Sequence, residues 1–155
     1  MKEILSHSIA DTAKFAQEFL AGLFPCADSS TVVGLYGDLG SGKTAFVQQI
    51  AKALGARGSV QSPTFVIMKK YALKNPPSLP PLLKGGYRGD LQLVHIDAYR
   101  LDSATDLKKL GWDALSSDHS NLIFIEWADR VADILPLDHI KLRFEFVDDT
   151  TRKIS

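Results

Sequence analysis

The sequence lacks the features that mark several classes of protein. Its single cysteine, Cys26, cannot form an intramolecular disulfide and has no partners at the spacing of a zinc site. No apolar run approaches the roughly eighteen residues of a membrane-spanning helix, and residues 1–8 contain no apolar core followed by a cleavage site. These absences predict a cytoplasmic protein without a membrane segment, in which Cys26 is a buried or unreactive thiol.

An excess of charge of one sign is also missing. The 18 Lys and Arg residues balance 18 Asp and Glu residues. The composition therefore gives no indication of a nucleic-acid or membrane surface, and direct RNA binding is not expected. With 45% hydrophobic residues over a length of 155, the chain suits one compact domain, residues 1–155.

Hydrophobic periodicity predicts strands that alternate with helices. Strands are expected at residues 3–6, 31–36, 65–73, 91–101, 121–127 and 139–147. Helices are expected from the N-cap Ser8 to about Leu23, from Lys43 to Gly55, and between Asp102 and Leu115, where Gly111 is a potential break. This order predicts an α/β fold with strands additional to the strand–helix units.

Residues 74–89 depart from this pattern. They hold four of the seven prolines and three of the eleven glycines, between two strands that a short turn could join. We interpret the segment as a mobile insertion that serves as a linker. A proline-rich ligand for a partner protein, presenting Pro77, Pro80 and Pro81, is the alternative.

A glycine-rich segment connects the predicted strand at residues 31–36 to the helix that follows. It reads Gly37-Asp38-Leu39-Gly40-Ser41-Gly42-Lys43-Thr44 and matches the phosphate-loop spacing G-x-x-x-x-G-K-[ST]. Glycines allow backbone N–H groups to surround phosphate oxygens, a lysine adds positive charge, and a threonine hydroxyl can bind magnesium. The alternative is an ordinary glycine turn, but a strand before the segment and an amphipathic helix after it favour a phosphate site.

Two acidic residues close buried strands and are candidates to orient a metal ion or water. Asp97 follows Leu-Val-His-Ile, and Glu126 follows Leu-Ile-Phe-Ile. Ligands of open α/β sheets collect at the carboxyl ends of strands, where these residues are expected. In the alternative interpretation each carboxylate caps a turn or pairs with Arg100 or Arg130.

Four motifs in order make the sequence resemble the bacterial TsaE (YjeE) family. They are the phosphate loop, Ser62-Pro63-Thr64-Phe65, His95-Ile96-Asp97-Ala98-Tyr99-Arg100-Leu101 and Ile125-Glu126-Trp127, and the resemblance runs from about residue 11 to 127. It implies a three-layer P-loop NTPase fold, with a partly parallel central sheet and additional antiparallel strands. It also implies an ATPase that uses Mg²⁺, supports threonylcarbamoyladenosine formation in tRNA and works with TsaB and TsaD proteins.

The resemblance assigns roles residue by residue. Lys43 and the loop around it would bind phosphates and promote the reaction, Thr44 and Glu126 would hold Mg²⁺, and Asp97 would be the acid required for hydrolysis. Thr12 falls at a threonine of the family's N-terminal pattern, near the nucleotide.

Three further motif residues have competing interpretations. Ser62 and Thr64 resemble a loop that senses the γ-phosphate, but ordinary turn chemistry explains them equally well. Trp127 is a candidate contact for a partner or nucleotide, although an aromatic residue after a buried strand is more often part of the core. His95 is interpreted as structural. The chain departs from the family pattern where Ala128-Asp129 replaces Pro-Glu, and in the length of residues 74–89.

The sequence supplies no obvious arginine at the phosphate site. Arg100 and Arg130 are the candidates, and the hypothesis is slow basal hydrolysis that partner proteins accelerate. A small-molecule kinase is an alternative, as is a nucleotide-dependent assembly factor with little turnover. A GTP switch is disfavoured because the Asn-Lys-x-Asp motif is absent.

Overall fold

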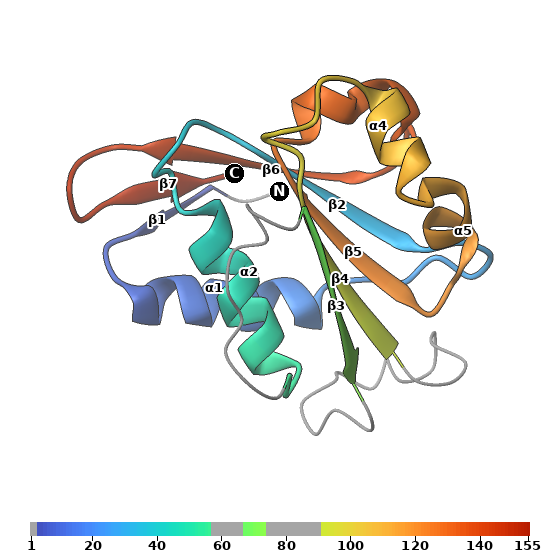
Figure 1. Cartoon of the computed structure of the whole chain (residues 1–155). Coiled ribbons are helices and arrows are strands. Elements are labelled where there is room, and N and C mark those ends of the chain that lie inside the picture. Colours follow the sequence, from blue (N-terminus) through green and yellow to red (C-terminus); the bar gives the residue numbers. More distant parts are fainter. Residues whose placement is uncertain (1–2, 57–66, 74–90) are drawn as a thin grey trace.

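The structure, a computed structural model, describes residues 3–56, 67–73 and 91–155. These residues form one seven-stranded sheet in the order β1-β7-β6-β2-β5-β4-β3 (Figure 1). The strands are β1 (Ile4–Ser6), β2 (Thr31–Tyr36), β3 (Met68–Leu73), β4 (Leu91–Asp97), β5 (Asn121–Glu126), β6 (Ile140–Phe146) and β7 (Arg152–Ile154). The central strands β6, β2, β5 and β4 pair in parallel, whereas β3, β7 and β1 pair antiparallel.

Helices cover both faces of the sheet, as Figure 1 shows. They are α1 (Ile9–Ala21), α2 (Lys43–Ala53), α4 (Ala104–Lys109), α5 (Trp112–Ser117) and the 3₁₀ helix η1 (Ala128–Ile134). Side chains alternate along β5, so that Leu122 and Phe124 pack in the core with α1 and α2. Ile123 and Ile125 join the core on the opposite face, with α4, α5 and η1. The predicted three-layer α/β fold with a partly parallel sheet is confirmed.

Several predicted elements are confirmed with small shifts at their ends. The strand at residues 31–36 has the predicted bounds, and β6 lies within residues 139–147. Ser8 is the N-cap of α1, and its hydroxyl oxygen accepts a hydrogen bond from the Asp11 N–H at 3.1 Å. Local periodicity and capping were therefore sufficient to predict these elements.

Two predictions need correction. The extended run at 91–101 is shorter, since β4 ends at Asp97 and the Asp97 carboxylate accepts a hydrogen bond from the Tyr99 N–H at 2.9 Å, which fixes a turn. The helix expected between 102 and 115 consists of α4 and α5, and Gly111 separates them with a φ of +90°. A residue with a side chain rarely adopts that conformation, so the break falls at the glycine.

The prediction missed η1 and β7. The strand at residues 139–147 is not the last, because β7 follows it and pairs with both β6 and β1.

The segment at 74–89 and residues Ser62 and Thr64 lie outside the described residues. The strands on either side of that segment pair antiparallel, with Leu73 opposite Leu91. Within the described ranges, no helix is both long and apolar enough to span a membrane.

Candidate functional site

The glycine-rich segment connects β2 to α2 at the carboxyl end of the parallel strands. Gly42 precedes α2 in a left-handed conformation, and no side chain caps the first N–H groups of the helix. Uncapped N–H groups and the helix dipole together favour an anion at this position. The loop therefore has the strand–loop–helix arrangement predicted from the sequence, and its role in binding phosphate stays a prediction.

The backbone of β6 passes directly behind this loop. Gly37 has a φ of +138°, and a Cβ atom at this position would lie 2.1 Å from the Phe144 carbonyl oxygen. Only glycine allows the two segments to approach so closely. β6 thus braces the loop at Gly37.

Lys43 is the first residue of α2, and its ammonium group folds back over the loop. Its Nζ donates hydrogen bonds to the carbonyl oxygens of Gly37, at 2.6 Å, and Asp38, at 2.8 Å, and to Ser41 Oγ, at 3.3 Å. Burial lowers the pKa of the Lys43 ammonium, whereas nearby carboxylates, with Glu126 first, act to raise it. The lysine is thus a buried cation, satisfied by the loop itself.

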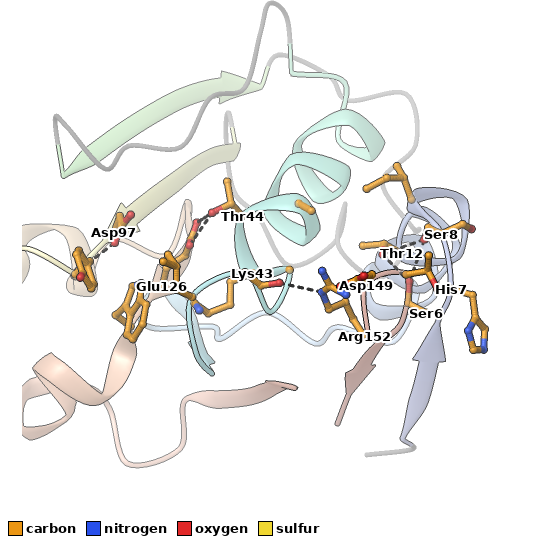
Figure 2. Close-up of a pocket in the computed structure, with 18 residues that line it drawn as sticks. Ser6, His7, Ser8, Thr12, Lys43, Thr44, Asp97, Glu126, Asp149 and Arg152 are labelled. Atoms are coloured by element: carbon orange, nitrogen blue, oxygen red, sulfur yellow. Dashed lines mark hydrogen bonds between the residues drawn. The ribbon is translucent and has the colours of Figure 1, made fainter. Parts of the chain in front are cut away.

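Thr44 and Glu126 meet across the site, from α2 and the end of β5. The Thr44 hydroxyl lies 2.8 Å from each of the two carboxylate oxygens of Glu126 (Figure 2). Asp97, at the end of β4, is opposite Glu126 in the register of the two parallel strands and is 4% exposed. The structure therefore brings together the two acidic residues that the sequence identified separately.

These oxygen atoms suit a magnesium ion. Mg²⁺ prefers hard oxygen ligands, and it usually takes one or two carboxylates together with oxygens of a bound phosphate. In the part of the chain that the structure describes, no group of three or more His, Cys, Asp and Glu residues could hold a metal ion by itself. The binding of Mg²⁺ by these residues stays a prediction.

A cavity of about 610 Å³ extends from this group of residues toward the two termini of the chain. Figure 2 shows its two ends. The first, here called the loop end, is lined by Lys43, Thr44, Asp97, Glu126, Tyr99 and Trp127. The second, here called the terminal end, is lined by Ser6, His7, Ser8, Ile9, Thr12, Asp149, Thr150 and Arg152.

The terminal end contains residues that the sequence analysis missed, with Arg152 foremost. Arg152 Nε donates to the Gly40 carbonyl oxygen at 2.9 Å, and Nη1 donates to the carbonyl oxygens of Asp148 and Thr151 at 2.6 and 3.0 Å. Its guanidinium also lies 4.5 Å from the centre of the Phe146 ring. Arg152 therefore connects β7 to the glycine-rich loop, a contact for which the sequence gives no local signal.

Thr12 lines the terminal end of the cavity, and its assignment to a nucleotide site stays a prediction. It is buried on α1, and its hydroxyl lies 2.8 Å from Ser6 Oγ. The Nδ1 atom of His7 contacts Thr151 Oγ1 at 3.1 Å, so this end joins the first turn of the chain to the last strand.

Trp127 is half-buried at the loop end, and it packs against the edge of the core that contains Ile123 and Ile125. Lys43 Nζ lies 4.3 Å from the centre of the Trp127 ring, and the centres of the Tyr99 and Trp127 rings are 5.0 Å apart. The Arg130 guanidinium lies 5.2 Å from the Tyr99 ring. Of the arginines in the described ranges, Arg152 lines the cavity, whereas Arg100 and Arg130 do not.

Comparison with known proteins identifies the family. The family model of the threonylcarbamoyl adenosine biosynthesis protein TsaE matches residues 6–154. The chain belongs to the TsaE family. The match extends beyond the range 11–127 on which the resemblance rested, and it includes β7 and the residues from Ser6 onward that line the terminal end of the cavity.

Individual TsaE proteins support this assignment. The TsaE protein of Rickettsia bellii is 32% identical over 151 residues, which cover 97% of this chain and 90% of the relative. That of Streptomyces coelicolor is 37% identical over 128 residues, with 79% and 74% coverage. A crystal structure of Bacillus subtilis YdiB superposes with a TM-score of 0.68 at 25% identity and covers 99% of this chain and 82% of YdiB. The family role is tRNA threonylcarbamoyladenosine biosynthesis.

Proposed function

We propose that this TsaE family protein binds ATP with Mg²⁺ in the cavity and hydrolyses ATP in support of threonylcarbamoyladenosine formation. One observation carries the proposal. Uncapped N–H groups at the start of α2, the Lys43 ammonium, and the paired Thr44 and Glu126 side chains converge at one end of a single cavity. This combination matches what a nucleoside triphosphate and its metal ion require.

The position of the cavity supports an orientation for the nucleotide. The triphosphate would occupy the loop end, where the Lys43 ammonium would exchange the carbonyl oxygens of Gly37 and Asp38 for phosphate oxygens. The ribose and base would then extend toward the terminal end, near Thr12 and Arg152. The exchange costs little because the ammonium remains fully hydrogen-bonded in both states.

Thr44 and Glu126 would hold the metal ion, which when bound neutralises charge on the phosphates. Asp97 is beside Glu126 in register and is buried at the same end of the sheet. We assign it to orient the attacking water, since hydrolysis of a γ-phosphate depends mainly on positioning. Ser62 and Thr64 stay predictions as γ-phosphate sensors, because they lie outside the described residues.

The positions of the arginines favour a slow rate of hydrolysis when the chain is alone. Arg152 reaches the cavity, but three main-chain carbonyl groups hold its guanidinium. An arginine that stabilises transferred phosphate contributes roughly 10³ to 10⁵ in rate. We therefore propose that partner proteins of the TsaB and TsaD type complete the site, and that turnover rises when they are added.

The test compares the wild type with Lys43→Ala and Asp97→Asn by calorimetry for ATP binding and by release of free phosphate. Lys43→Ala should weaken ATP binding, because a buried charge–phosphate contact is lost. Asp97→Asn should bind ATP nearly as well and lose roughly 10² to 10⁴ in turnover. Equal activity in all three proteins would contradict the assignment of the site.

Two controls complete this test. Product analysis should show inorganic phosphate and no phosphorylated metabolite, since the latter would indicate a small-molecule kinase. Addition of TsaB and TsaD proteins to the wild type should raise the rate of phosphate release. An unchanged rate would remove the partner-dependent part of the proposal and leave nucleotide-dependent assembly as the function to consider.

A further inference from the structure

His95 is a buried histidine directly behind the proposed metal site. It lies on β4, two residues before Asp97, and none of its surface is exposed. Its Nε2 atom donates a hydrogen bond to Glu126 Oε1 at 2.7 Å, and Glu126 is itself 3% exposed. No residue in the described ranges is a partner for its Nδ1 atom.

The surroundings make a polar residue at this position costly. Leu93 and Leu91 precede His95 on the same face of β4, and both are buried in the core with α2. A buried nitrogen without a partner is unfavourable, and a leucine at position 95 would avoid that cost. The contact with Glu126 is therefore the feature of His95 that an apolar side chain would lack.

Glu126 needs a second donor because Thr44 alone does not fix its carboxylate. The Thr44 hydroxyl has one proton and lies 2.8 Å from both carboxylate oxygens, so it does not distinguish them. His95 contacts Oε1 alone. Oε1 is therefore contacted by both Thr44 and His95, whereas Oε2 is contacted by Thr44 alone and keeps more of its lone-pair capacity for another ligand.

We propose that His95 is a positioning residue that holds Glu126 Oε1 and thereby presents Oε2 to the metal ion. This inference rests on the proposed function, because it concerns how the site binds Mg²⁺ with ATP. Residues behind metal ligands fix the orientation of those ligands, and their loss typically lowers metal affinity by about 10- to 100-fold. His95 itself touches neither the metal nor the nucleotide.

Two amide variants test the contact. Glutamine places its amide nitrogen near the position of the histidine Nε2, whereas asparagine is one methylene shorter and does not reach Glu126. The variants His95→Gln and His95→Asn are both polar and both smaller than histidine. Leu93→Ala is a matched control for disturbed packing, because Leu93 lies on the same face of β4 and pairs with Leu122.

The measurement is Mn²⁺ binding, followed by electron paramagnetic resonance, with a non-hydrolysable ATP analogue present. His95→Asn should weaken Mn²⁺ binding by about 10- to 100-fold, and His95→Gln should restore most of the loss. Leu93→Ala should bind Mn²⁺ as the wild type does, although it should melt at a lower temperature. Analogue affinity measured with EDTA should be equal in the wild type and both His95 variants.

Other results would overturn the inference. If His95→Asn binds Mn²⁺ as tightly as the wild type, or if His95→Gln is no better than His95→Asn, His95 does not position Glu126. If Leu93→Ala loses Mn²⁺ binding as His95→Asn does, general packing explains the effect. A wild type that binds no analogue would instead overturn the proposed function together with the inference, so the two failures are distinguishable.

Discussion

The two ends of the cavity are built in different ways. At the loop end, the side chains come from the carboxyl ends of adjacent parallel strands and from the helix that follows one of them. At the terminal end, they come from the first and last described segments of the chain, which meet where β1 pairs antiparallel with β7. Both ends join segments that are far apart in the sequence, but the parallel strands of the central sheet hold the loop end, whereas the terminal end depends on the pairing of β1 with β7, in which Ile4 lies opposite Ile154.

The two ends of the cavity should respond differently to substitution. The loop end lies on strands that are paired on both sides, so its backbone is held by the central sheet. The terminal end is built around β1 and β7, which have three residues each, and β1 is the edge strand of the sheet. Short edge strands contribute few contacts, and we expect changes at this end to affect nucleotide affinity more than the stability of the whole fold.

The largest effect is expected at Gly37, where the glycine-rich loop packs against β6. Gly37→Ala would place a methyl group 2.1 Å from the Phe144 carbonyl oxygen, in a backbone conformation that disfavours a side chain. Overpacking costs about 1–3 kcal/mol and the backbone strain about 1–3 kcal/mol. Urea denaturation should therefore show a loss of roughly 2–6 kcal/mol in the free energy of unfolding.

Gly40→Ala is the matched control for this change. Gly40 also has a positive φ, of +76°, but no described atom lies within 4 Å of the added methyl group. Backbone strain alone should then cost about 1–2 kcal/mol. Equal losses for the two variants would show that β6 does not brace the loop.

An intermediate effect is expected at Arg152, which links the terminal end to the loop. Arg152→Gln removes the hydrogen bond to the Gly40 carbonyl oxygen and a positive charge in the cavity. The guanidinium would lie beside the bound nucleotide, and loss of its charged contact there, about 1.5–3 kcal/mol, should weaken ATP binding by roughly 10- to 100-fold in calorimetry. Turnover at saturating ATP should change much less, because the loop end is intact.

Lys153→Gln is the control on the same strand. Lys153 Nζ lies 3.1 Å from Glu3 Oε1 and 3.9 Å from Glu145 Oε1, and the lysine does not line the cavity. Exposed pairs of this kind contribute about 0–1 kcal/mol to stability. ATP affinity should therefore stay at the wild-type value. A similar loss of affinity in both variants would mean that net charge, rather than the Arg152 contact, is responsible.

The smallest effect is expected at the start of α1. Ser8→Ala removes the N-cap hydrogen bond to the Asp11 N–H, which should cost about 1 kcal/mol in urea denaturation. Because Ser8 lies at the terminal end, ATP affinity should fall slightly, and phosphate release at saturating ATP should stay unchanged. A lower maximal rate would show that the two ends are not separable.

The same contrast explains what the sequence could predict. Four site residues could be located from motif spacing and from the ends of strongly patterned elements. Lys43 and Thr44 begin α2, and Asp97 and Glu126 end β4 and β5. Parallel pairing of β4 with β5 then brings Asp97 and Glu126 together, as expected for adjacent strand ends. The roles of these residues stay predictions that the proposed experiments address.

Other features carried no local signal. β7 has three residues, Arg-Lys-Ile, too few for a periodic pattern, and it pairs both with β6 across a short turn and with β1, almost 150 residues away. Arg152 was missed for that reason. His95 was interpreted as structural because nothing in the sequence indicates that β4 and β5 place it against Glu126.

A crystal structure with a non-hydrolysable ATP analogue and Mg²⁺ tests the central claim most directly. We predict the triphosphate within the glycine-rich loop, the Lys43 ammonium on phosphate oxygens in place of the Gly37 and Asp38 carbonyl groups, and the base at the terminal end near Arg152. An analogue bound elsewhere, or one whose base lies toward Asp97 and whose phosphates lie toward Arg152, would contradict the account.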